Sequence, residues 1–195
     1  MCIRDSNNTI RTIYEDRSGI IWIGTDGGFA WFDDTEKKFV FCNVEDESSG
    51  KNAIWTYGIS EDLGGNIWLA TCSGGVFGMK REDLLTRSDK MIPATSNYCM
   101  MNETFKLKYD GCLGMFCDAS GNIWVNAERW LYKIDNRENK AFYFSEQLTS
   151  IPCRSVKTIF CDENGEIWGA HRDALFKVNP QGDLLEEIDV SSYTE

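Results

Sequence analysis

Short apolar runs that are rich in β-branched and aromatic residues recur along the chain, and each ends at a turn. Thr9–Asp16 and Val156–Asp162 are two such runs, and their composition is typical of β-strands. A second run follows the turn, as in Ile21–Thr25 and Ile67–Thr71, and its consecutive residues are mostly apolar. Because neighbouring residues of a strand point to opposite faces, this second strand must be covered on both sides. The pattern predicts antiparallel strands and excludes a helical repeat.

One motif joins these two strands: Asp, two residues, Gly, two residues and Trp, with Ile directly before the Trp. The four copies are Asp16-Gly19-Trp22, Asp62-Gly65-Trp68, Asp118-Gly121-Trp124 and Asp162-Gly165-Trp168. Asp at the first position and Gly at the fourth are typical of a type I turn. The four Trp residues, which we expect in the core, are 46, 56 and 44 residues apart. Such a period is typical of propellers.

A third and a fourth strand complete each unit. They are clearest at Leu131–Asp135 and Leu175–Asn179 for the third strand, and at Lys38–Cys42, Ala141–Phe144 and Leu184–Val190 for the fourth. Four antiparallel strands that are covered on both faces describe one blade of a β-propeller. The sequence therefore predicts an all-β fold of four such blades.

We expect residues 1–6 to be a non-native or disordered start and residues 7–195 to form one propeller segment. The repeats cover about 8–44, 52–84, 110–145 and 154–190, with an inserted loop of about 85–109 that holds one weak strand at Phe105–Tyr109. An unclosed array leaves the edges of its end blades exposed. We therefore expect a fragment of a larger propeller, and a small closed or self-associating propeller is the alternative.

The charge balance narrows the range of partners. Lys and Arg number 20 against 31 Asp and Glu, which gives a net charge of −11, whereas binding to a phosphate backbone requires clustered positive charge. No stretch approaches the roughly 20 apolar residues of a membrane helix. We expect no nucleic acid and no membrane contact for this segment.

The eight Cys residues are not spaced like metal ligands, because no Cys-x-x-Cys occurs. Cys117 and Cys161 occupy the repeat position that holds Glu15 and Glu61 in the first two copies. A position that accepts either residue type is a poor metal ligand, so we expect half-buried thiols that act as small hydrophobic residues. One adventitious disulfide in an oxidising compartment is the alternative.

The strand order places two kinds of turn on opposite rims, because each strand crosses the blade once. The rim opposite the Asp-x-x-Gly turns carries the turns between second and third strands and the connections between blades. It holds Thr25–Gly28, Thr71–Gly75, Ala127–Trp130, His171–Asp173 and the long Lys80–Asp110 segment. Because these residues differ from copy to copy, we expect a binding surface there.

Four residues on this rim are candidate ligand contacts: Arg129, Trp130, His171 and Arg172. An indole beside a guanidinium forms a platform for a sugar ring, with N–H groups for hydroxyls or for a uronate carboxylate. The alternatives are that Trp130 packs against the next blade and that His171 is a satisfied rim or core side chain. Trp55 lies near the same rim, where we expect it to pack between blades.

No catalytic residue, metal site or cofactor site is predicted. The chain has one His and no G-x-S-x-G motif, so no nucleophile and base can be paired. Gly27-Gly28 and Gly74-Gly75 are repeat turns rather than phosphate loops. Each turn Asp supplies one carboxylate, which is too few for a calcium site, and we expect these side chains to cap their turns.

The full pattern of the first two copies resembles the two-component regulator propeller repeat. The matching residues of copy one are Ile10, Ile13, Glu15-Asp16, Gly19, Ile21–Thr25, Gly27-Gly28-Phe29 and Phe32-Asp33. Those of copy two are Ile59, Glu61-Asp62, Gly65, Asn66–Thr71 and Gly74-Gly75-Val76. Copies three and four depart after the Trp, where residues 126–130 and 169–173 replace the Gly-Thr-x-Gly-Gly segment. The resemblance covers about residues 8–190.

The resemblance implies a non-catalytic sensor. Repeats of that family build large, typically seven-bladed propellers that form the periplasmic sensor of hybrid histidine kinases, many of which respond to polysaccharide fragments. It implies a small-molecule or oligosaccharide ligand and the remaining blades of a parent protein as partners, with a homodimer as an open alternative. Kinase activity would belong to a part of the parent outside this chain. A propeller enzyme of the lyase or quinoprotein type and a protein-binding scaffold are the alternative functions.

Overall fold

A computed structural model describes residues 9–46, 51–52, 55–72, 75–86, 91–93, 111–127, 130–135, 140–143, 156, 158–171 and 174–190. Of residues 44–46, 51–52, 91–93, 130, 140–143 and 171 it describes the backbone only. The expected start at residues 1–6 and the expected strand at Phe105–Tyr109 lie outside these ranges.

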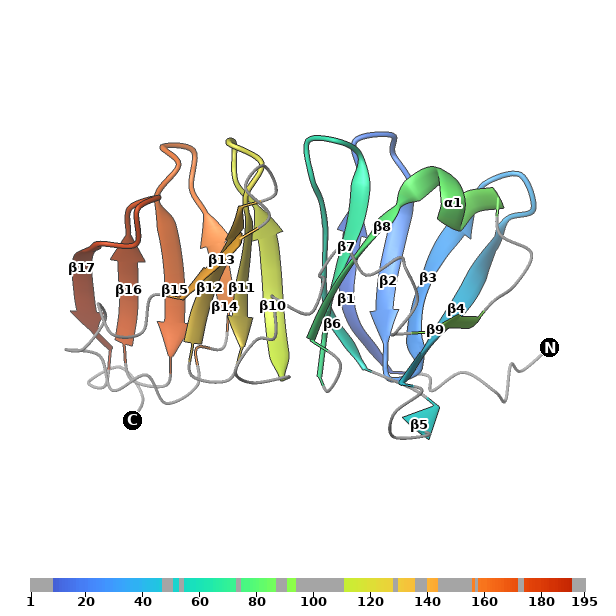
Figure 1. Ribbon diagram of the computed structural model, residues 1–195, viewed down its shortest axis with the longest axis horizontal. Helices are drawn as coiled ribbons and strands as arrows, with labels where there is room; N and C mark the ends of the chain where they lie inside the picture. Colours follow the sequence, from blue (N-terminus) through green and yellow to red (C-terminus); the bar gives the residue numbers. More distant parts are fainter. Residues whose placement is uncertain are drawn as a thin grey trace.

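Four antiparallel sheets follow one another along the chain, and we call them blades 1 to 4 (Figure 1). Blade 1 consists of β1 (Ile10–Glu15), β2 (Ile21–Thr25), β3 (Gly28–Asp33) and β4 (Lys38–Asp46). Blade 2 consists of β6 (Thr56–Glu61), β7 (Asn66–Thr71) and β8 (Gly75–Lys80). Blade 3 consists of β10 (Cys112–Cys117), β11 (Ile123–Ala127), β12 (Trp130–Asp135) and β13 (Lys140–Tyr143). Blade 4 consists of β14 (Thr158–Cys161), β15 (Ile167–His171), β16 (Ala174–Val178) and β17 (Leu184–Asp189).

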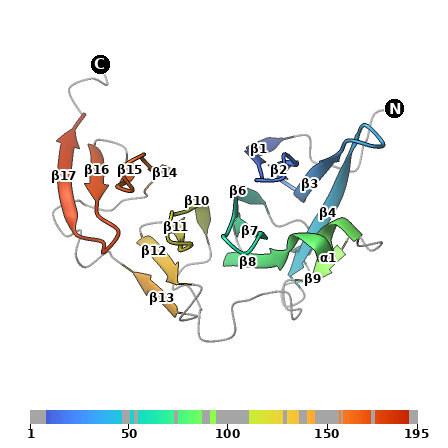
Figure 2. The same ribbon diagram turned by 90° about the horizontal axis from the view of Figure 1, so that it is seen from above.

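The blades are arranged as in a propeller. Within each blade the strands lie in chain order from the inside outward, and the inner strand β6 contacts β1 on one side and β10 on the other, while β10 contacts β14. Viewed from above, the inner strands lie together and the outer strands fan outward in an open arc (Figure 2). The expected all-β propeller fold is confirmed, and the arc is consistent with a segment of a larger propeller.

The two rims carry the expected kinds of turn, with one correction. We call the rim with the Asp-x-x-Gly turns the Asp rim and the rim with the turns after β2, β7, β11 and β15 the connection rim (Figure 1). The expectation that the whole Lys80–Asp110 segment lies on the connection rim is wrong. Because β8 is a third strand, it ends at the Asp rim, where α1 (Arg81–Thr86) follows it.

The outer edge of blade 1 gains two short strands. β9 (Met91–Pro93) pairs with β4 in parallel, through Asn43–Glu45, and β5 (Lys51–Asn52) pairs with it in antiparallel fashion. Blade 2 has three strands within the described residues. Among the helices in these residues, none has the length and apolar character of a membrane span.

The Asp-x-x-Gly-x-x-Trp motif forms the same hydrogen-bonded unit in all four blades. The turn Gly donates its N–H to the carbonyl of the Asp over 2.9–3.1 Å, and its φ of 79–88° favours glycine. One carboxylate oxygen of the Asp accepts two backbone N–H groups of the turn. The other oxygen accepts the indole N–H of the Trp over 2.8–3.0 Å. The Asp therefore caps its turn, as expected, and also orients the Trp.

Three of the four oriented Trp residues pack on the following blade. Trp22 contributes to a core with residues such as Ile59 and Leu69 of blade 2, Trp68 to a core with blade 3 and Trp124 to a core with blade 4. These three indoles are at most 1% exposed. Trp168 differs, because its side chain is only partly buried, and no described blade follows blade 4.

The face of each inner strand that packs against the preceding blade is likewise buried only where such a blade is described. Ile59, Met115 and Ile159 hold one register position on the inner strands of blades 2 to 4 and are 4%, 9% and 7% exposed. Ile13 holds this position in blade 1 and is 68% exposed, because no described blade precedes it. The core residues are therefore buried by the contact between adjacent blades.

An ionic network joins blades 1 and 2 at the Asp rim. The buried carboxylate of Glu61 accepts the backbone N–H of Arg17 over 2.8 Å and its Nε–H over 3.0 Å. Arg81, at the start of α1, donates its Nη1–H to the same carboxylate over 3.1 Å. Arg17 Nη2 also donates to the carbonyl of Asp62, and the N–H of Glu61 donates to the hydroxyl of Tyr14 over 3.1 Å. Glu61 thus connects blade 1, blade 2 and the helix.

The same two register positions carry different chemistry at the other junctions. The residue after the motif Asp in one blade and the residue before it in the next are Arg17 with Glu61, Leu63 with Cys117, and Ala119 with Cys161. A charged pair thus occurs at the first junction, and an apolar residue with a thiol at the other two. Glu therefore stands at this repeat position where the preceding blade supplies Arg17, and Cys where it supplies an apolar residue.

Replacing Asp118 by Ala tests the Asp–Trp unit. The substitution leaves the buried indole N–H of Trp124 and two turn N–H groups without their acceptor, and we expect it to lower the free energy of unfolding by about 2–4 kcal/mol. Asp162→Ala is the matched control, because Trp168 is partly exposed and water can replace the lost acceptor there. Urea unfolding followed by tryptophan fluorescence measures both variants. Equal losses in the two blades would contradict the proposed role of burial.

Replacing Glu61 by Gln tests the ionic network. The amide cannot satisfy two guanidinium groups, and hydrogen bonds to charged groups each contribute more than neutral ones, so we expect a loss of about 1–3 kcal/mol in unfolding free energy. Glu163→Gln alters an exposed turn residue and should leave this free energy within about 0.5 kcal/mol of the wild type. If Glu61→Gln is as stable as Glu163→Gln, the network does not hold the junction.

Candidate functional site

The inner strands of blades 1 to 3 share a β-bulge near the connection rim. The register shifts between Ile10 and Thr12 in β1, between Thr56 and Gly58 in β6, and between Cys112 and Gly114 in β10. A bulge inserts one extra residue and redirects its side chain. The inserted positions hold Arg11, Tyr57 and Leu113, so the repeated bulge presents a different side chain in each blade.

Arg11 is bound to the adjacent turn of its own blade. Its Nε–H donates to Asp26 Oδ1 over 2.5 Å and its Nη2–H donates to Asp26 Oδ2 over 3.1 Å. Asp26 lies in the turn between β2 and β3, and its backbone N–H donates to the carbonyl of Thr9 over 3.3 Å. The bidentate geometry fixes the plane of the guanidinium.

Two aromatic rings of blade 2 lie against the same guanidinium. The Arg11 Cζ atom is 5.3 Å from the ring centroid of Trp55 and 5.3 Å from that of Tyr57, a separation typical of cation–π contacts. The two rings are 6.4 Å apart and inclined by 56°. The backbone of Trp55 is held in turn, because its carbonyl accepts the N–H of Cys72 over 2.9 Å.

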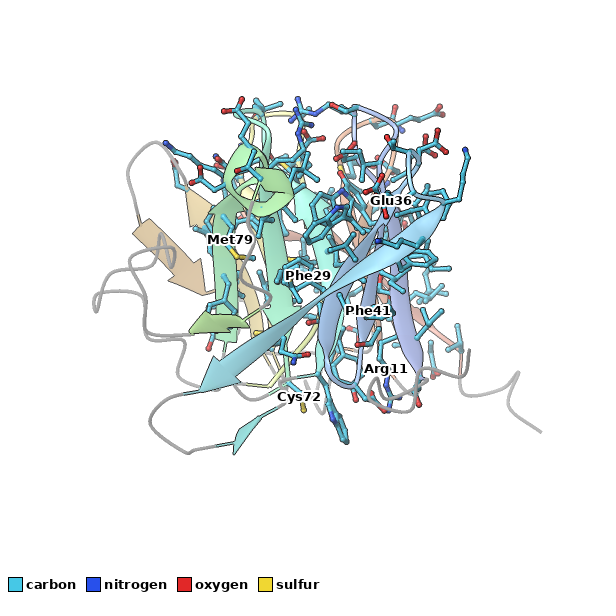
Figure 3. The ribbon with its side chains drawn as sticks, turned by 90° about the vertical axis from the view of Figure 1, so that its right-hand side faces the viewer. Arg11, Phe29, Glu36, Phe41, Cys72 and Met79 are labelled. Atoms are coloured by element: carbon cyan, nitrogen blue, oxygen red, sulfur yellow. The ribbon has the colours of Figure 1, made fainter. Side chains whose placement is uncertain are left out.

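These four residues, Arg11, Asp26, Trp55 and Tyr57, form what we call the rim cluster. Figure 3 shows Arg11 and Cys72 together at the connection rim, at the end of the molecule opposite Glu36. Trp55 contacts blade 1 through Arg11, as expected of a residue that packs between blades, but it is 41% exposed, so its ring lies at the surface. The rim cluster joins blade 1 to blade 2 at this rim as the Glu61 network does at the other.

The electrostatics of the rim cluster keep the Arg11–Asp26 pair ionised. The hydrogen bond from Arg11 has the largest effect and lowers the pKa of Asp26. Burial opposes it, and the charge of Arg11 and a side-chain hydrogen bond with Thr9 lower this pKa further. The hydrogen bond to Asp26 raises the pKa of Arg11 in return. The pair carries no net charge, and the two hydrogen bonds to Asp26 use two of the five N–H groups of the guanidinium.

The chemistry of the rim cluster suits binding. It combines an exposed indole, hydrogen-bond donors of a guanidinium and acceptors of a carboxylate within one rigid arrangement. Arg and ionised Asp that are paired with each other offer neither a nucleophile nor a proton-transfer group with a pKa near neutrality. The rim cluster therefore combines the kinds of group that contact a ligand with a flat apolar face and polar edges.

The four residues expected to bind a ligand stay a prediction. Arg129 and Arg172 lie outside the described residues. Trp130 begins β12, where its backbone pairs with Ala127, and His171 ends β15, where its backbone pairs with Ala174. Both positions lie on the connection rim, and the structure does not describe their side chains.

Sequence reasoning did not identify three of the four rim-cluster residues: Arg11, Asp26 and Tyr57. A signal was present, because Arg11, Tyr57 and Leu113 each lie five residues before the Asp of their motif. A position that varies within an otherwise regular repeat is a candidate for function. The bulge that directs these side chains becomes visible only in the strand register.

The thiolate form is disfavoured in two cysteines next to the motif. Burial raises the pKa of Cys117 to about 12, and the charge of Asp118 adds to this effect. Burial likewise raises the pKa of Cys161, followed by the charge of Asp162. Because the thiolate is the nucleophilic form, neither side chain is reactive at neutral pH. Within the described residues, no group of three His, Cys, Asp or Glu side chains is placed to hold a metal ion.

Comparison with known proteins supports the sequence resemblance. A model of the family described as "Two component regulator propeller" matches residues 5–27. A search of curated proteins found no match.

Two solved extracellular domains are similar to this chain in fold. The extracellular domain of a hybrid two component system from B. thetaiotaomicron is 29% identical, with a TM-score of 0.81 over 97% of this chain and 25% of that one. The corresponding domain of a second such system from the same organism is 21% identical, with a TM-score of 0.67 over 92% and 23%. The chain therefore spans about a quarter of the length of these domains.

A propeller of different function has a similar fold. Virginiamycin B lyase from Staphylococcus aureus is 12% identical, with a TM-score of 0.70 over 97% of this chain and 57% of that one. At this identity the likeness concerns the fold alone.

Removing the Arg11 guanidinium tests the electrostatic description of the rim cluster. In Arg11→Gln we expect the pKa of Asp26 to rise toward its ordinary value of 3.8. Because the folded pKa is lowered, the pair stabilises the fold above the ordinary Asp pKa, and this contribution is lost as pH falls through the lowered value. A carboxyl-carbon NMR titration measures the shift.

Asp162 serves as the internal control for this titration. The hydrogen bond from Trp168 lowers the pKa of Asp162, and this bond lies in blade 4, far along the chain from Arg11. Asp162 should titrate identically in both proteins. An unchanged Asp26 titration in Arg11→Gln would show that Arg11 does not determine the ionisation of Asp26.

Proposed function

Since this chain carries the two-component regulator propeller repeat, we propose that it is a non-catalytic, ligand-sensing segment of the extracellular part of a two-component sensor. The observation that carries the proposal is the 29% identity and TM-score of 0.81 to the extracellular domain of a hybrid two component system, over 97% of this chain. We propose a periplasmic location and a parent histidine kinase on the same ground. The remaining blades of the parent are the expected partners of the exposed end faces, and a homodimer is a further one.

The rim cluster supports the sensing role. It lies on the rim whose turns differ from copy to copy, and it exposes an indole that the fold does not bury. An oligosaccharide is the proposed ligand, because sugar rings have an apolar face and hydroxyl edges that match an aromatic ring beside a paired Arg and Asp.

Sensing would proceed by a population shift. A ligand that binds one arrangement of the blades or of the parent dimer more tightly raises the fraction of that arrangement. The rim cluster is suited to this effect, because Arg11 and Asp26 belong to blade 1 and Trp55 and Tyr57 to blade 2. The altered arrangement would then bias a kinase outside this chain.

An enzymatic function has less support. The similarity to a lyase propeller is limited to the fold, and the described thiols with raised pKa are not nucleophiles. The paired Arg11 and Asp26 stay ionised over the neutral pH range and do not exchange protons with a substrate.

Sequencing the genomic locus on both sides of the reading frame tests the sensor assignment. We expect the frame to continue into further Asp-x-x-Gly-x-x-Trp copies, a membrane helix and a histidine kinase. A start codon near Asn7 together with a stop codon directly after Glu195 would refute the assignment. Incubating the protein with oligosaccharides and analysing them by mass spectrometry provides the matching control: a sensor leaves them intact, whereas a lyase produces shorter, unsaturated products.

A further inference from the structure

We propose that the rim cluster is a subsite for one uncharged sugar ring, which stacks on the exposed face of Trp55 while its hydroxyl groups hydrogen-bond with Arg11 and Asp26. The oligosaccharide class rests on the proposed function. The location of the site and its preference for an uncharged ring come from the geometry and charge of the rim cluster.

The exposure of Trp55 is unexplained by the fold. Of the tryptophans whose side chains are described, Trp55 alone is exposed, at 41%. Its register equivalents, seven residues before the motif Asp, are Thr9 in blade 1 and Gly111 in blade 3. Because blades form with Thr or Gly at this position, an aromatic ring there is not a requirement of blade packing. An exposed indole beside polar groups presents both an apolar face and hydrogen-bonding neighbours to a ligand.

The indole is held in place before any ligand binds. One of its contacts is the Arg11 guanidinium, with the Arg11 Cζ atom 5.3 Å from its centroid, and the bidentate bond to Asp26 immobilises that guanidinium. Tyr57 supports the guanidinium at the same distance. The N–H of Cys72 fixes the backbone of Trp55 over 2.9 Å. A platform that is already ordered loses little side-chain entropy when a ring stacks on it.

Charge selects between sugar types. The guanidinium charge is balanced by Asp26, so an acidic ring would gain little attraction from Arg11 and would bring its carboxylate close to that of Asp26. The chain as a whole carries a net charge of −11, which opposes a polyanionic chain further. An uncharged ring meets no such repulsion, and its hydroxyls can donate to the carboxylate and accept from the guanidinium.

Binding of the 195-residue protein to defined oligosaccharides tests the subsite. The probes are hexamers of glucose, galactose, mannose, arabinose and xylose as the uncharged set, and galacturonic acid hexamer as the acidic one. Titration calorimetry measures affinity, and the indole N–H resonances in an NMR spectrum report which Trp is contacted. We expect at least one uncharged hexamer to bind and to shift the Trp55 resonance, with the acidic hexamer binding more weakly.

Three variants identify the residues involved. Trp55→Ala should weaken binding about tenfold or more, whereas Phe160→Ala, which removes a 54% exposed ring in blade 4, should bind like the wild type. Asp26→Asn leaves the charge of Arg11 unbalanced, so the ratio of acidic to uncharged affinity should rise. Circular dichroism confirms that each variant is folded. The Asp26→Asn ratio is a readout that a merely structural role of the rim cluster would not change.

The proposal is overturned if no uncharged hexamer binds the folded protein, if Trp55→Ala binds as tightly as Phe160→Ala, or if galacturonic acid hexamer is preferred. The sensor assignment fails separately, through a genomic locus that lacks a kinase. Binding at Trp55 in a protein without a kinase would refute the sensor assignment and leave the subsite in place.

Discussion

The hydrogen bond from each motif indole to its turn carboxylate is the interaction on which the rest of the structure depends. Without it, the Asp would cap a turn and the Trp would be one apolar residue among others. With it, the Trp ring has one orientation relative to its own strand, because indole N–H and turn share the same acceptor group. That orientation directs the ring of Trp22, Trp68 and Trp124 to the following blade. A local turn thus determines a long-range contact.

Because all four blades contain the Asp–Trp unit, the junctions differ in the residues next to this unit. At the Asp rim the first junction uses the ion pair of Arg17 and Glu61, while the equivalent positions at the second hold Leu63 and Cys117. Either choice is self-consistent: a buried carboxylate needs its guanidinium partners, and a neutral thiol needs none. Replacing Arg17 by an apolar residue would leave the buried carboxylate of Glu61 with Arg81 as its one guanidinium partner among the two described here. The first junction therefore differs in its chemistry from the other two.

The strands, the turns and the buried Trp positions could be predicted from the sequence, because each depends on residues that are close in the chain. Apolar runs indicate the strands, and an Asp and a Gly at fixed spacing indicate the turns that precede each Trp. The rim cluster could not be predicted, because Arg11 and Trp55 are 44 residues apart and meet only when two blades pack. No Gly or Pro marks the bulge that turns Arg11 outward. The prediction that places the Lys80–Asp110 segment wholly on the connection rim is wrong for a simpler reason: it treats the segment as a connection between blades, whereas β8 ends at the Asp rim and α1 follows it there.

The two rims of the repeat differ in what they keep constant: the Asp rim keeps the side chains of its motif, and the connection rim keeps its backbone register. On the Asp rim, all four copies keep the same carboxylate, glycine and indole, because these groups maintain the packing of the blades. On the connection rim, the bulge holds Arg11, Tyr57 or Leu113 with the same backbone register, so side chains there can change without altering the core. A site that joins bulge residues and their neighbours from adjacent blades has a further consequence. Any ligand that touches both Arg11 and Trp55 spans a junction, and its binding energy then depends on how the two blades sit against each other. In a propeller built in this way, recognition at one rim would depend on the packing that the Asp–Trp units maintain at the other.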